Sequence, residues 1–594
     1  MFTFTSGEVE RSPDFERVKA LPRRRWDEDA EARNYVKLMS EHFRTPAGSI
    51  NDTLRPVQAA SLVEMAHNGG LFGPQRVGAG KTLTSLLGFL VLRAQRPVLL
   101  LPANLIEKTN RDIEKLRKIW HIPGNVARIS YEMLGHPAHS QDLENASPDV
   151  IIADECHKLK STDAAVTARV KRYMQKNPQT KFVALSGTMI RNSMEEYYHL
   201  IRWCLKERAP VPFDLAEQKS WSGCLDPKKP LDGMSVKPGV LVELCNKEEL
   251  AIFAEDPTKA ARIAYRRRLN ETPGVVATEE GALMNRAGTG VMSLNIDSIN
   301  VELPDIKDIV SDLKLEKMHP DGYKCIDKIE VWRHLRELCC GFYYRWNPLP
   351  PPEWRAARSG WAWFVNEELK KYPEIDTEGQ IINLIESGEI ISPEYDQWQT
   401  ERKRPLPDTG EPFVINTEAV WIDEGMLHAC TKWLKQNVGI CWVEHIEFGK
   451  RLAEISGLPY YGSGGLNEAG RDIVDDFPDK DKHGNPSPPA KKSIIASIAA
   501  NATGKNLQVF KRNLIPLTPM SSSTWEQMLG RTHRDGQQAD EVSATLLISM
   551  KEQVIWYELA VAVARNVSDM SGQEQKLCYA TSTVVLQENA PSGA

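Results

Sequence analysis

Short apolar runs separated by amphipathic stretches are the feature that most limits how this chain can fold. They lie at residues 98–101, 150–153 and 182–185, and again at residues 438–443 and 493–496. Apolar runs of this length between helical segments are typical of parallel strands that are buried on both faces of a sheet. The pattern predicts an α/β fold with parallel sheets in two parts of the chain.

Composition narrows the class of protein. Of the 594 residues, 41% are hydrophobic and 26% are charged, as in ordinary soluble globular proteins. No apolar run reaches the roughly 18 residues that a membrane span needs, and the first residues lack the basic and apolar segments of a secretory signal. None of the ten cysteines forms a Cys-x-x-Cys pair, so we expect reduced thiols and no zinc ribbon. We therefore expect a cytoplasmic protein without a membrane partner.

The formal net charge of −6 excludes a protein that coats nucleic acid through its overall charge, although local basic stripes are compatible with it. One such stripe is the run at residues 266–268, with Arg262 one helical turn earlier. It fits either a phosphate contact or a solvated helix face.

Aromatic residues and arginines interleave between Phe342 and Phe364. The arginines in and near the aromatic groups are Arg345, Arg355 and Arg358. Aromatic side chains can stack on unpaired bases while arginines hold the backbone. The alternative interpretation is an aromatic core beneath a long connection.

A glycine-rich segment, Val-Gly-Ala-Gly-Lys-Thr, ends at Thr82. Gly78 and Gly80 permit a tight loop whose backbone N–H groups face a phosphate at a helix N-terminus. Lys81 is then expected to reach the β- and γ-phosphates, and the hydroxyl of Thr82 to coordinate Mg²⁺. The full pattern has a further glycine where this chain has Gln75. The alternative is a plain glycine turn.

Two adjacent carboxylates, Asp154 and Glu155, follow the apolar run at residues 150–153. Open α/β sheets bind their ligands at the carboxyl ends of the strands. We expect Asp154 to hold Mg²⁺ and Glu155 to orient and deprotonate the attacking water. An acidic turn at a strand end is the alternative, and the preceding glycine-rich segment favours the catalytic interpretation.

Three further side chains are candidates for nucleotide contacts. Ser186 and Thr188 follow a third apolar run, where they can relay a nucleotide signal or simply form a turn. Gln58 can donate and accept hydrogen bonds together, as an adenine edge requires. Its segment fits a helix start equally well, because Pro56 is suited to the first turn of a helix.

A polar segment near the end of the chain carries Gln527, Arg531 and Arg534. The two arginines are three residues apart, so on a helix they share one face. Two guanidinium groups on one face suit the charge that grows on a γ-phosphate during its transfer, as arginine fingers do. The alternative is a solvated basic helix end.

These segments, taken in order, resemble the motifs of Swi/Snf-type DNA translocases, a DEAD/DEAH-like branch of the superfamily 2 helicases. Residues 527–537 are similar to the sixth motif of that family, and residues 77–82 to its first. Residues 154–157 resemble the Asp-Glu-Ala-His box, with Cys156 in place of alanine. Residues 54–58 resemble the Leu-Arg-Pro-Tyr-Gln motif, with valine in place of tyrosine.

Three further segments extend the resemblance. Residues 185–192 are similar to the Thr-Gly-Thr-Pro stretch of the family, with Ser186 and Met189 as departures. Residues 502–507, which include Gly504, resemble its fifth motif. Residues 335–339 resemble a short family segment between the lobes.

The resemblance implies two RecA-like lobes with a helical or irregular insertion between them and a small N-terminal segment. It implies ATP and Mg²⁺ as cofactors, and we assign their sites accordingly. The residues expected to bind the nucleotide are Gln58, Gly78, Gly80, Lys81, Thr82, Ser186, Thr188 and Gly504; the metal ligands are Thr82 and Asp154; and the catalytic residues are Glu155, Gln527, Arg531 and Arg534.

The implied activity is ATP-driven movement on duplex, forked or branched DNA, with the second lobe supplying the arginines when the lobes close. The compact layout fits a phage-encoded protein of the host cytoplasm that works with replication or recombination proteins, or in repair. The alternatives are a strand-separating helicase, a motor subunit of a restriction or repair complex, and a nucleotide-gated DNA-binding protein with weak turnover.

The expected domain boundaries follow the motifs and the changes in composition. They are an N-terminal segment at 1–48, the first lobe at 49–205, a connecting subdomain at 206–325, an aromatic-rich helical region at 326–420, the second lobe at 421–580 and a tail at 581–594. Residues 18–27 are similar to the start of the substrate-recognition module of annealing helicases. A basic turn before a helix is the alternative there.

Overall fold

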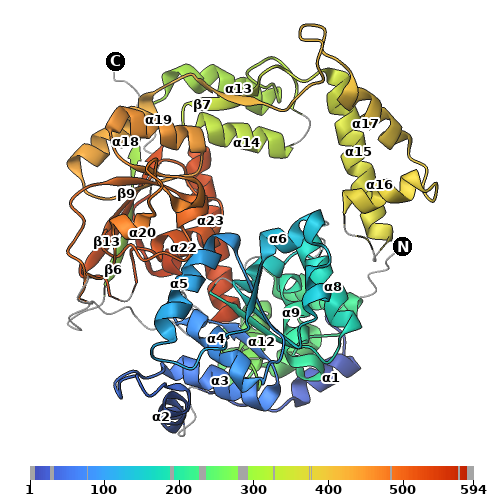
Figure 1. Ribbon diagram of the computed structural model, residues 1–594, viewed down its shortest axis with the longest axis vertical. Coiled ribbons are helices and arrows are strands. Elements are labelled where there is room, and N and C mark those ends of the chain that lie inside the picture. Colours follow the sequence, from blue (N-terminus) through green and yellow to red (C-terminus); the bar gives the residue numbers. More distant parts are fainter. Residues whose placement is uncertain are drawn as a thin grey trace. The chain divides into compact units, whose positions relative to one another are not determined.

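The computed structural model divides the chain into two compact units. Unit 1 comprises Met1–Leu294, Pro519–Asp540 and Glu558–Ala580, and unit 2 comprises Asn295–Thr518, Glu541–Tyr557 and Thr581–Ala594. The structure describes residues 7–26, 32–75, 78–162, 164–187, 193–226, 236–278, 292–325, 328–372, 375, 377–481, 485–534, 536–572 and 575–584. Each unit contains a sheet with flanking helices (Figure 1).

Unit 1 is built around a five-stranded sheet with the strand order β1-β5-β4-β2-β3. All four pairs of neighbouring strands are parallel. The strands are β1 (Leu71–Pro74), β2 (Pro97–Leu101), β3 (Ala127–Ser130), β4 (Val150–Asp154) and β5 (Lys181–Ser186). Three of them, β2, β4 and β5, coincide with predicted apolar runs.

Alternate residues of these strands supply two separate cores, one on each face of the sheet. Leu99 and Ile152 pack with helices α3 and α4, whereas Leu100 and Ile151 pack with α8 and α9. This is the expected result of an apolar run in a strand, because successive side chains point to opposite faces. The helices are α3 (Pro56–Asn68), α4 (Lys81–Val91), α8 (Ala165–Lys176) and α9 (Tyr198–Leu205).

The other segments of unit 1 are mainly helical. The stretch after residue 206, expected to be a helical or irregular insertion, forms three helices of this unit. The remaining helices are α1 (Pro13–Ala20), α2 (Ala32–Phe43), α5 (Ile106–Leu116), α6 (Tyr131–Gly135), α7 (Asp142–Ala146), α10 (Leu215–Leu225), α11 (Lys247–Ile252), α12 (Pro257–Asn270), α22 (Ser522–Leu529) and α24 (Lys576–Tyr579), with the second half of α23 (Lys551–Ser571).

The arginine run on α12 holds backbone segments together. Arg268 donates to the carbonyl oxygens of Val18 at 2.9 Å and Leu21 at 2.7 Å. Arg267 pairs with Glu249 at 2.9 Å, and its neighbour Arg266 donates to carbonyls near the end of α23. The interpretation as a solvated face is therefore wrong, and a phosphate contact is disfavoured as well, because each of the three guanidinium groups donates to an acceptor inside the unit.

Residues 18–26 lie against unit 1. The backbone N–H of Arg24 donates to the Glu271 carbonyl at 2.6 Å, and its side chain lies 3.2 Å from the buried carboxylate of Glu64. Trp26 donates its indole N–H to the Ala277 carbonyl at 3.1 Å. The resemblance of this segment to annealing helicases stays a prediction.

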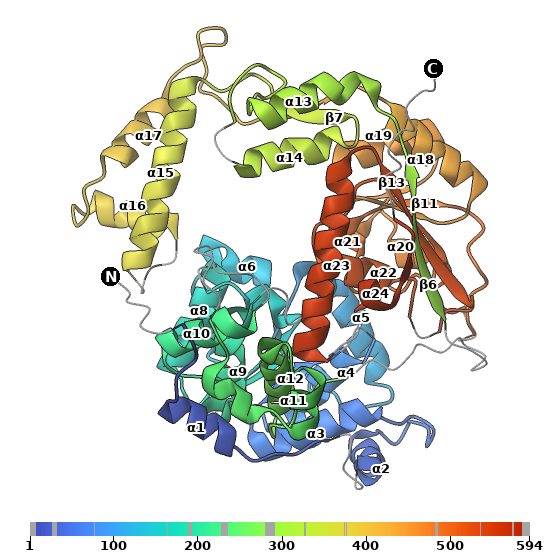
Figure 2. The same ribbon diagram turned by 180° about the vertical axis from the view of Figure 1, so that it is seen from behind.

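Unit 2 contains a seven-stranded sheet with the order β10-β11-β9-β12-β13-β6-β14. Figure 2 shows β6 running along β13, although β6 precedes every other strand of this sheet in the sequence. The strands are β6 (Ser293–Asn300), β9 (Ile440–Val443), β10 (Tyr460–Tyr461), β11 (Ile494–Ser497), β12 (Arg512–Ile515), β13 (Glu541–Ile548) and β14 (Thr581–Ser582). The predicted α/β class with two parallel sheets, as expected for RecA-like lobes, is confirmed.

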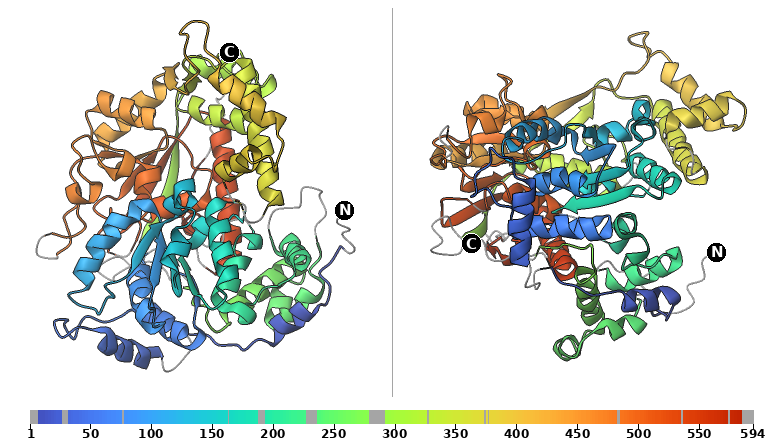
Figure 3. Two further views of the ribbon diagram at one scale, coloured as in Figure 1. Left: turned by 45° about the vertical axis from the view of Figure 1, so that its right-hand side comes forward. Right: turned by 60° about the horizontal axis from the view of Figure 1, so that its bottom comes forward.

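A group of three helices forms a distinct part of unit 2. In it α15 packs along α17 and contacts α16 (Figure 3). They are α15 (Pro352–Lys371), α16 (Glu378–Glu386) and α17 (Pro393–Lys403), and the antiparallel strands β7 (Phe342–Trp346) and β8 (Thr417–Trp421) flank them in sequence. The remaining helices are α13 (Lys307–Leu315), α14 (Lys328–Leu338), α18 (Gly425–Gln436), α19 (Ile446–Ser456), α20 (Ile473–Asp476) and α21 (Ile498–Asn501). None of the described helices has the length and hydropathy to span a bilayer.

Candidate nucleotide site

The carboxyl ends of three neighbouring strands meet at one edge of the sheet in unit 1. Pro74 of β1 is opposite Ser186 of β5, and Asp154 of β4 is opposite Leu185 of β5. The glycine-rich segment, the serine and the acidic pair therefore leave the sheet at the same edge, where α/β sheets bind ligands.

The glycine-rich segment forms a tight loop that opens α4. Gly78 and Gly80 have φ angles of 90° and 85°, in the left-handed region that favours glycine. Gly80 is the N-cap of α4, and no side chain caps this end. The Gly80 carbonyl accepts the N–H groups of Leu83 and Thr84, and an N-terminus without a side-chain cap is suited to an anion. Residues 76 and 77 lie outside the described part of the chain.

Two side chains from the start of α3 brace this loop. Arg55 donates to the carbonyl oxygen of Gly78, and the Gln58 amide donates to that of Gly80 at 3.0 Å. The oxygen of the same amide accepts the backbone N–H of Arg55 at 2.8 Å. The helix start at Pro56 is present, and both ends of the Gln58 amide bond to protein. Its contact with adenine stays a prediction.

Gln75, which replaces the usual glycine, is buried beneath the loop. It donates from its side chain to the hydroxyl of Ser61 at 2.7 Å. Its backbone carbonyl accepts a bond from the ammonium group of Lys81 at 3.3 Å. Lys81 is only 8% exposed. Gln75 therefore joins the end of β1 to α3 through its side chain and to Lys81, at the start of α4, through its backbone carbonyl.

The acidic pair carries local backbone strain and strong electrostatic coupling. Glu155 has a φ of 55°, which is rare for a residue other than glycine and is often found at functional sites. Burial and the neighbouring Glu155 charge raise the pKa of Asp154 to about 6. Burial also acts to raise the pKa of Glu155, but Lys81 and His157 outweigh it and hold that pKa below its usual range. Glu155 is therefore ionised at neutral pH.

A hydrogen-bonded network joins Glu155 to the end of β5. His157 lies in the short 3₁₀ helix η3 (Cys156–Leu159), with its Nδ1 3.0 Å from the Ser186 hydroxyl and 3.3 Å from the Glu155 carboxylate. Ser186 donates to Glu155 at 3.2 Å. Ser186 is thus hydrogen-bonded directly to the Glu155 carboxylate, the contact that a relay of a nucleotide signal requires. Thr188, the other predicted hydroxyl, lies outside the described residues.

Arg531 and Arg534 lie in turns after α22, because that helix ends at Leu529. The prediction that they share one face of a helix is wrong. The N–H of Arg531 bonds to the Met528 carbonyl, three residues back rather than four. The α-helix therefore ends in a 3₁₀-type turn. Arg531 donates from Nε to the Gln527 carbonyl at 2.9 Å.

The second arginine lies against the glycine-rich loop. A Cβ atom built on Gly78 falls 3.2 Å from Nη2 of Arg534. Both residues belong to unit 1, as does the whole segment Pro519–Asp540. The arginines were expected on the second lobe, but their segment belongs to the same compact unit as Lys81. Gly504 lies in unit 2, in a turn after α21 with a φ of 72°.

The cations around the loop repel one another. Burial, and then the charge of Arg534, lower the pKa of Arg531 to about 9, although Glu155 acts to raise it. Burial also lowers the pKa of Lys108, with smaller contributions from the same two arginines. A triphosphate relieves this repulsion, because it brings negative charge among several cations.

Lys108, which lies 3.8 Å from Asp112, is a further cation on the side of these arginines that the sequence interpretation did not name. It lies on α5, which follows the carboxyl end of β2 at the ligand edge of the sheet. No glycine or acidic motif marks its segment. The available signal was its position just after the apolar run at residues 98–101.

The side chains present fit a magnesium–nucleotide complex. Thr82 and Asp154 offer a hydroxyl and a carboxylate, the hard oxygen ligands that Mg²⁺ takes, and nucleotide sites supply few protein ligands because the phosphates supply others. No cluster of three or more His, Cys, Asp or Glu ligands occurs in the described parts of the chain. The open first turn of α4 and Lys81 fit the phosphates.

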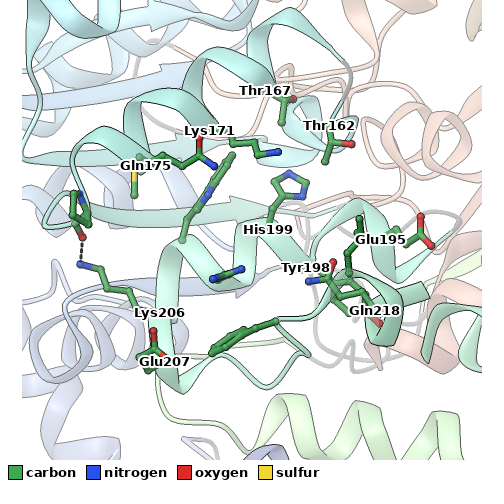
Figure 4. Close-up of a pocket in the computed structure, with 16 residues that line it drawn as sticks. Thr162, Thr167, Lys171, Gln175, Glu195, Tyr198, His199, Lys206, Glu207 and Gln218 are labelled. Atoms are coloured by element: carbon green, nitrogen blue, oxygen red, sulfur yellow. Dashed lines mark hydrogen bonds between the residues drawn. The ribbon is translucent and has the colours of Figure 1, made fainter. Parts of the chain in front are cut away.

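Unit 1 also contains a cavity that none of the candidate nucleotide-site residues lines. It has a volume of about 720 Å³ and is bounded by side chains of α8, α9 and α10, including Lys171, His199 and Gln218 (Figure 4). His199 donates from Nε2 to the Leu159 carbonyl at 2.7 Å, and burial lowers its pKa to about 4.

The comparison with protein families bears on residues 106–338, which match the model of the SNF2-related domain. The match includes Asp154, Glu155 and Ser186, and it confirms the resemblance to Swi/Snf-type proteins. Lys81 and the two arginines lie outside the matched residues of the SNF2-related domain.

Two individual proteins show local or distant similarity. The chain is 31% identical over 61 residues to the Transcriptional regulator ATRX homolog of Caenorhabditis elegans, which is 10% of this chain and 4% of that protein. A structure of Mycobacterium smegmatis helicase Lhr bound to ssDNA and AMP-PNP matches with a TM-score of 0.38 and 12% identity, over 94% of this chain and 51% of that one. The chain thus spans a small part of the first and about half of the second, and a TM-score this low does not bear on the fold.

Proposed function

We propose that this chain is an ATP-dependent DNA motor of the Swi/Snf type, which couples ATP hydrolysis to movement on, or remodelling of, duplex or branched DNA. One observation carries the proposal. Unit 1 gathers Lys81 at the start of α4, the pair Asp154 and Glu155 at the end of β4, and the cations Arg531 and Arg534. A protein that only binds nucleotide needs neither the acidic pair nor the arginines.

The residues divide the work of phosphoryl transfer. Lys81 and the open N–H groups of α4 bind the phosphates, and Thr82 and Asp154 are suited to hold Mg²⁺, which neutralises phosphate charge when bound. Glu155 is ionised and orients the attacking water by accepting a hydrogen bond from it. Arg531 and Arg534 stabilise the charge that develops in the transition state.

DNA is the proposed partner because residues 106–338 match the model of the SNF2-related domain. A phage-encoded role in replication, recombination or repair and a cytoplasmic location stay predictions.

The test is ATP hydrolysis by the full chain without DNA and with single-stranded, duplex and forked DNA. We expect strong stimulation by at least one DNA and almost no turnover in Lys81→Ala, because that variant loses the charge that meets the phosphates. Strand displacement on the forked DNA then separates a helicase from a translocase. Turnover that no DNA stimulates, or that survives in Lys81→Ala, contradicts the proposal.

A further inference from the structure

Unit 2 contains a small cavity at the start of α15, far in sequence from the nucleotide site. Its volume is about 230 Å³. The side chains that define it are aromatic or charged, and they come from three segments of the unit: Tyr323, Glu330, Trp346, Trp354, Arg355 and Arg358. They belong to the aromatic and arginine-rich region for which the sequence left two interpretations open.

The aromatic wall of this cavity is fixed by packing. Trp354 on α15 is 4% exposed and contacts Phe413 and Trp398, with ring centroids 4.8 and 5.3 Å away. Trp346, at the end of β7, is half-buried and lies 6.0 Å from Trp354 and 5.9 Å from Phe413. The core interpretation therefore holds for part of the aromatic group. Trp346 and Trp354, however, also present surface to the cavity.

Two guanidinium groups lie on aromatic faces around the same cavity. The guanidinium carbon of Arg358 is 5.3 Å from the ring centroid of Trp354 and 5.9 Å from that of Trp346. That of Arg355 is 4.6 Å from the ring of Tyr323, which in turn stacks on His319 at 4.2 Å. Planar guanidinium groups held in this way are suited to stack on a further flat group.

Among the described residues neither of these two arginines forms an ion pair, and Glu330, the carboxylate on the cavity wall, pairs with Arg333 at 3.8 Å. Elsewhere in unit 2, Arg345 bonds to Glu418 at 2.7 Å and Arg336 bonds to Glu444 at 3.2 Å. Within the described residues, Arg355 and Arg358 make ring contacts and no ion pair within 4.0 Å. Positive charge beside an aromatic cavity favours a ligand that combines a flat ring with an anion.

The size of the cavity limits the ring. A cavity of roughly 150 Å³ holds one benzene molecule, so about 230 Å³ accommodates a single nucleobase but no longer stack. Glu330 on the cavity wall can accept a hydrogen bond, and every DNA base has an N–H group that can donate one. A phosphate on either side of the base is the natural partner of the arginines.

We propose that this cavity binds one unpaired base of single-stranded DNA, with Trp346 and the guanidinium groups as stacking surfaces and Arg355 and Arg358 also contacting the flanking phosphates. The inference rests on the proposed function and deepens it, because it makes DNA with unpaired bases a preferred substrate over continuous duplex. Base stacking on protein side chains is tolerant of sequence, so the site selects unpaired structure rather than a sequence.

The test compares two fluorescent probes with the full chain: a 12-nucleotide oligothymidylate, and an abasic 12-mer that keeps the phosphates and lacks the bases. Anisotropy titrations give the affinity of each for the wild type, Trp346→Leu, Arg358→Ala and Arg358→Lys. Trp363→Ala is the matched control, since Trp363 is on the same helix, 61% exposed and outside the cavity.

We expect Trp346→Leu to weaken binding of the oligothymidylate by about 5- to 150-fold, the range for one stacked base, and to leave the abasic probe unchanged. Arg358→Ala weakens both probes, and Arg358→Lys recovers the abasic probe more than the oligothymidylate. Trp363→Ala binds both as the wild type does. Arg358 is exposed, so this variant keeps the fold even if Trp346→Leu does not.

Wild-type affinity for oligothymidylate in both Trp346→Leu and Arg358→Ala overturns the proposal. An equal loss for the two probes in Trp346→Leu also overturns it, because stacking requires a base. ATP hydrolysis stimulated by duplex DNA is measured on the same proteins. If that stimulation is present while the probe results are negative, the cavity proposal fails and the proposed function stands.

Discussion

Arg267 on α12 and Arg531 after α22 both lie in basic segments of unit 1, yet their surroundings shift their pKa values in opposite directions. The hydrogen bond to Glu249 raises the pKa of Arg267. Burial and the charge of Arg534 lower the pKa of Arg531 to about 9. The charge of Arg267 is matched by Glu249 within the protein, whereas Arg531 lies beside a second cation, Arg534.

The difference teaches how to separate a structural arginine from a functional one. The run on α12 bonds to backbone carbonyls and a carboxylate, as helix and loop connectors do. The segment after α22 brings one guanidinium group to the glycine-rich loop and sets another beside it. Residue type and spacing are similar in the two segments, so the neighbours decide the role. Four predictions probe this distinction.

The largest effect is expected for Arg534→Ala. This group meets charge that develops in the transition state, so DNA-stimulated hydrolysis should fall about 1,000-fold while nucleotide affinity stays within a few-fold. Arg534→Lys should recover little, because an ammonium group lacks the planar fork. Turnover and nucleotide binding are measured on the same folded protein. Wild-type turnover in both variants would place Arg534 with the structural arginines.

Glu155→Gln should lower turnover by roughly 100-fold or more, with ATP still bound. The amide keeps the shape of the carboxylate and removes the group that accepts the proton of water. Single-turnover hydrolysis and equilibrium nucleotide binding give the two quantities. Asp154→Ala serves as the contrast, since it should weaken magnesium-dependent binding itself. Normal hydrolysis by Glu155→Gln would move water activation to another residue.

Arg268→Ala should lower the free energy of unfolding by about 2 kcal/mol and leave turnover per folded molecule unchanged. The variant leaves the carbonyls of Val18 and Leu21 without their donor. Urea titration measures the stability, and hydrolysis at low urea measures the activity. A stable protein with reduced affinity for DNA would return this run to the phosphate interpretation.

Arg267→Ala should have the smallest effect, about 1 kcal/mol, because its ion pair with Glu249 is partly open to solvent. The loss should shrink in 1 M salt, since salt screens partly exposed pairs. Arg268→Ala is the control, because its hydrogen bonds to neutral carbonyls depend less on salt. Equal salt dependence of the two variants would contradict the contrast between them.

Local pattern predicted the strands that place the candidate site. The apolar runs around Ile151 and Val183 became β4 and β5, because such runs fit only a strand that is covered on both faces. The acidic pair lies at the end of β4, whereas the glycine-rich loop follows β1, the neighbour of β5 in the sheet. Strand β6 was missed, because its buried residues Leu294 and Ile296 alternate with more exposed ones and form no apolar run.

What the sequence did not predict depends on contacts between distant residues. Arg268 on α12 donates to the carbonyl of Val18, which is 250 residues away in the sequence, and the residues around Arg268 do not predict that partner. Lys108 lies on the side of Arg531 and Arg534 only because α5 begins at the ligand edge of the sheet. The end of α22 at Leu529 was not predicted, because the three-residue spacing of Arg531 and Arg534 also fits a longer helix.

The backbone passes from one compact unit to the other five times, because unit 1 is assembled from three separate segments. This order has a consequence for the newly made chain. Synthesis at about 5–20 residues per second leaves an interval of roughly 12 to 48 s between Leu294, the end of the first segment of unit 1, and Arg534 in its second segment. During that interval the nascent protein has its glycine-rich loop but not its arginines. If synthesis stops before residue 531, the released chain therefore has the residues proposed to bind a nucleotide but lacks the arginines proposed to promote its hydrolysis.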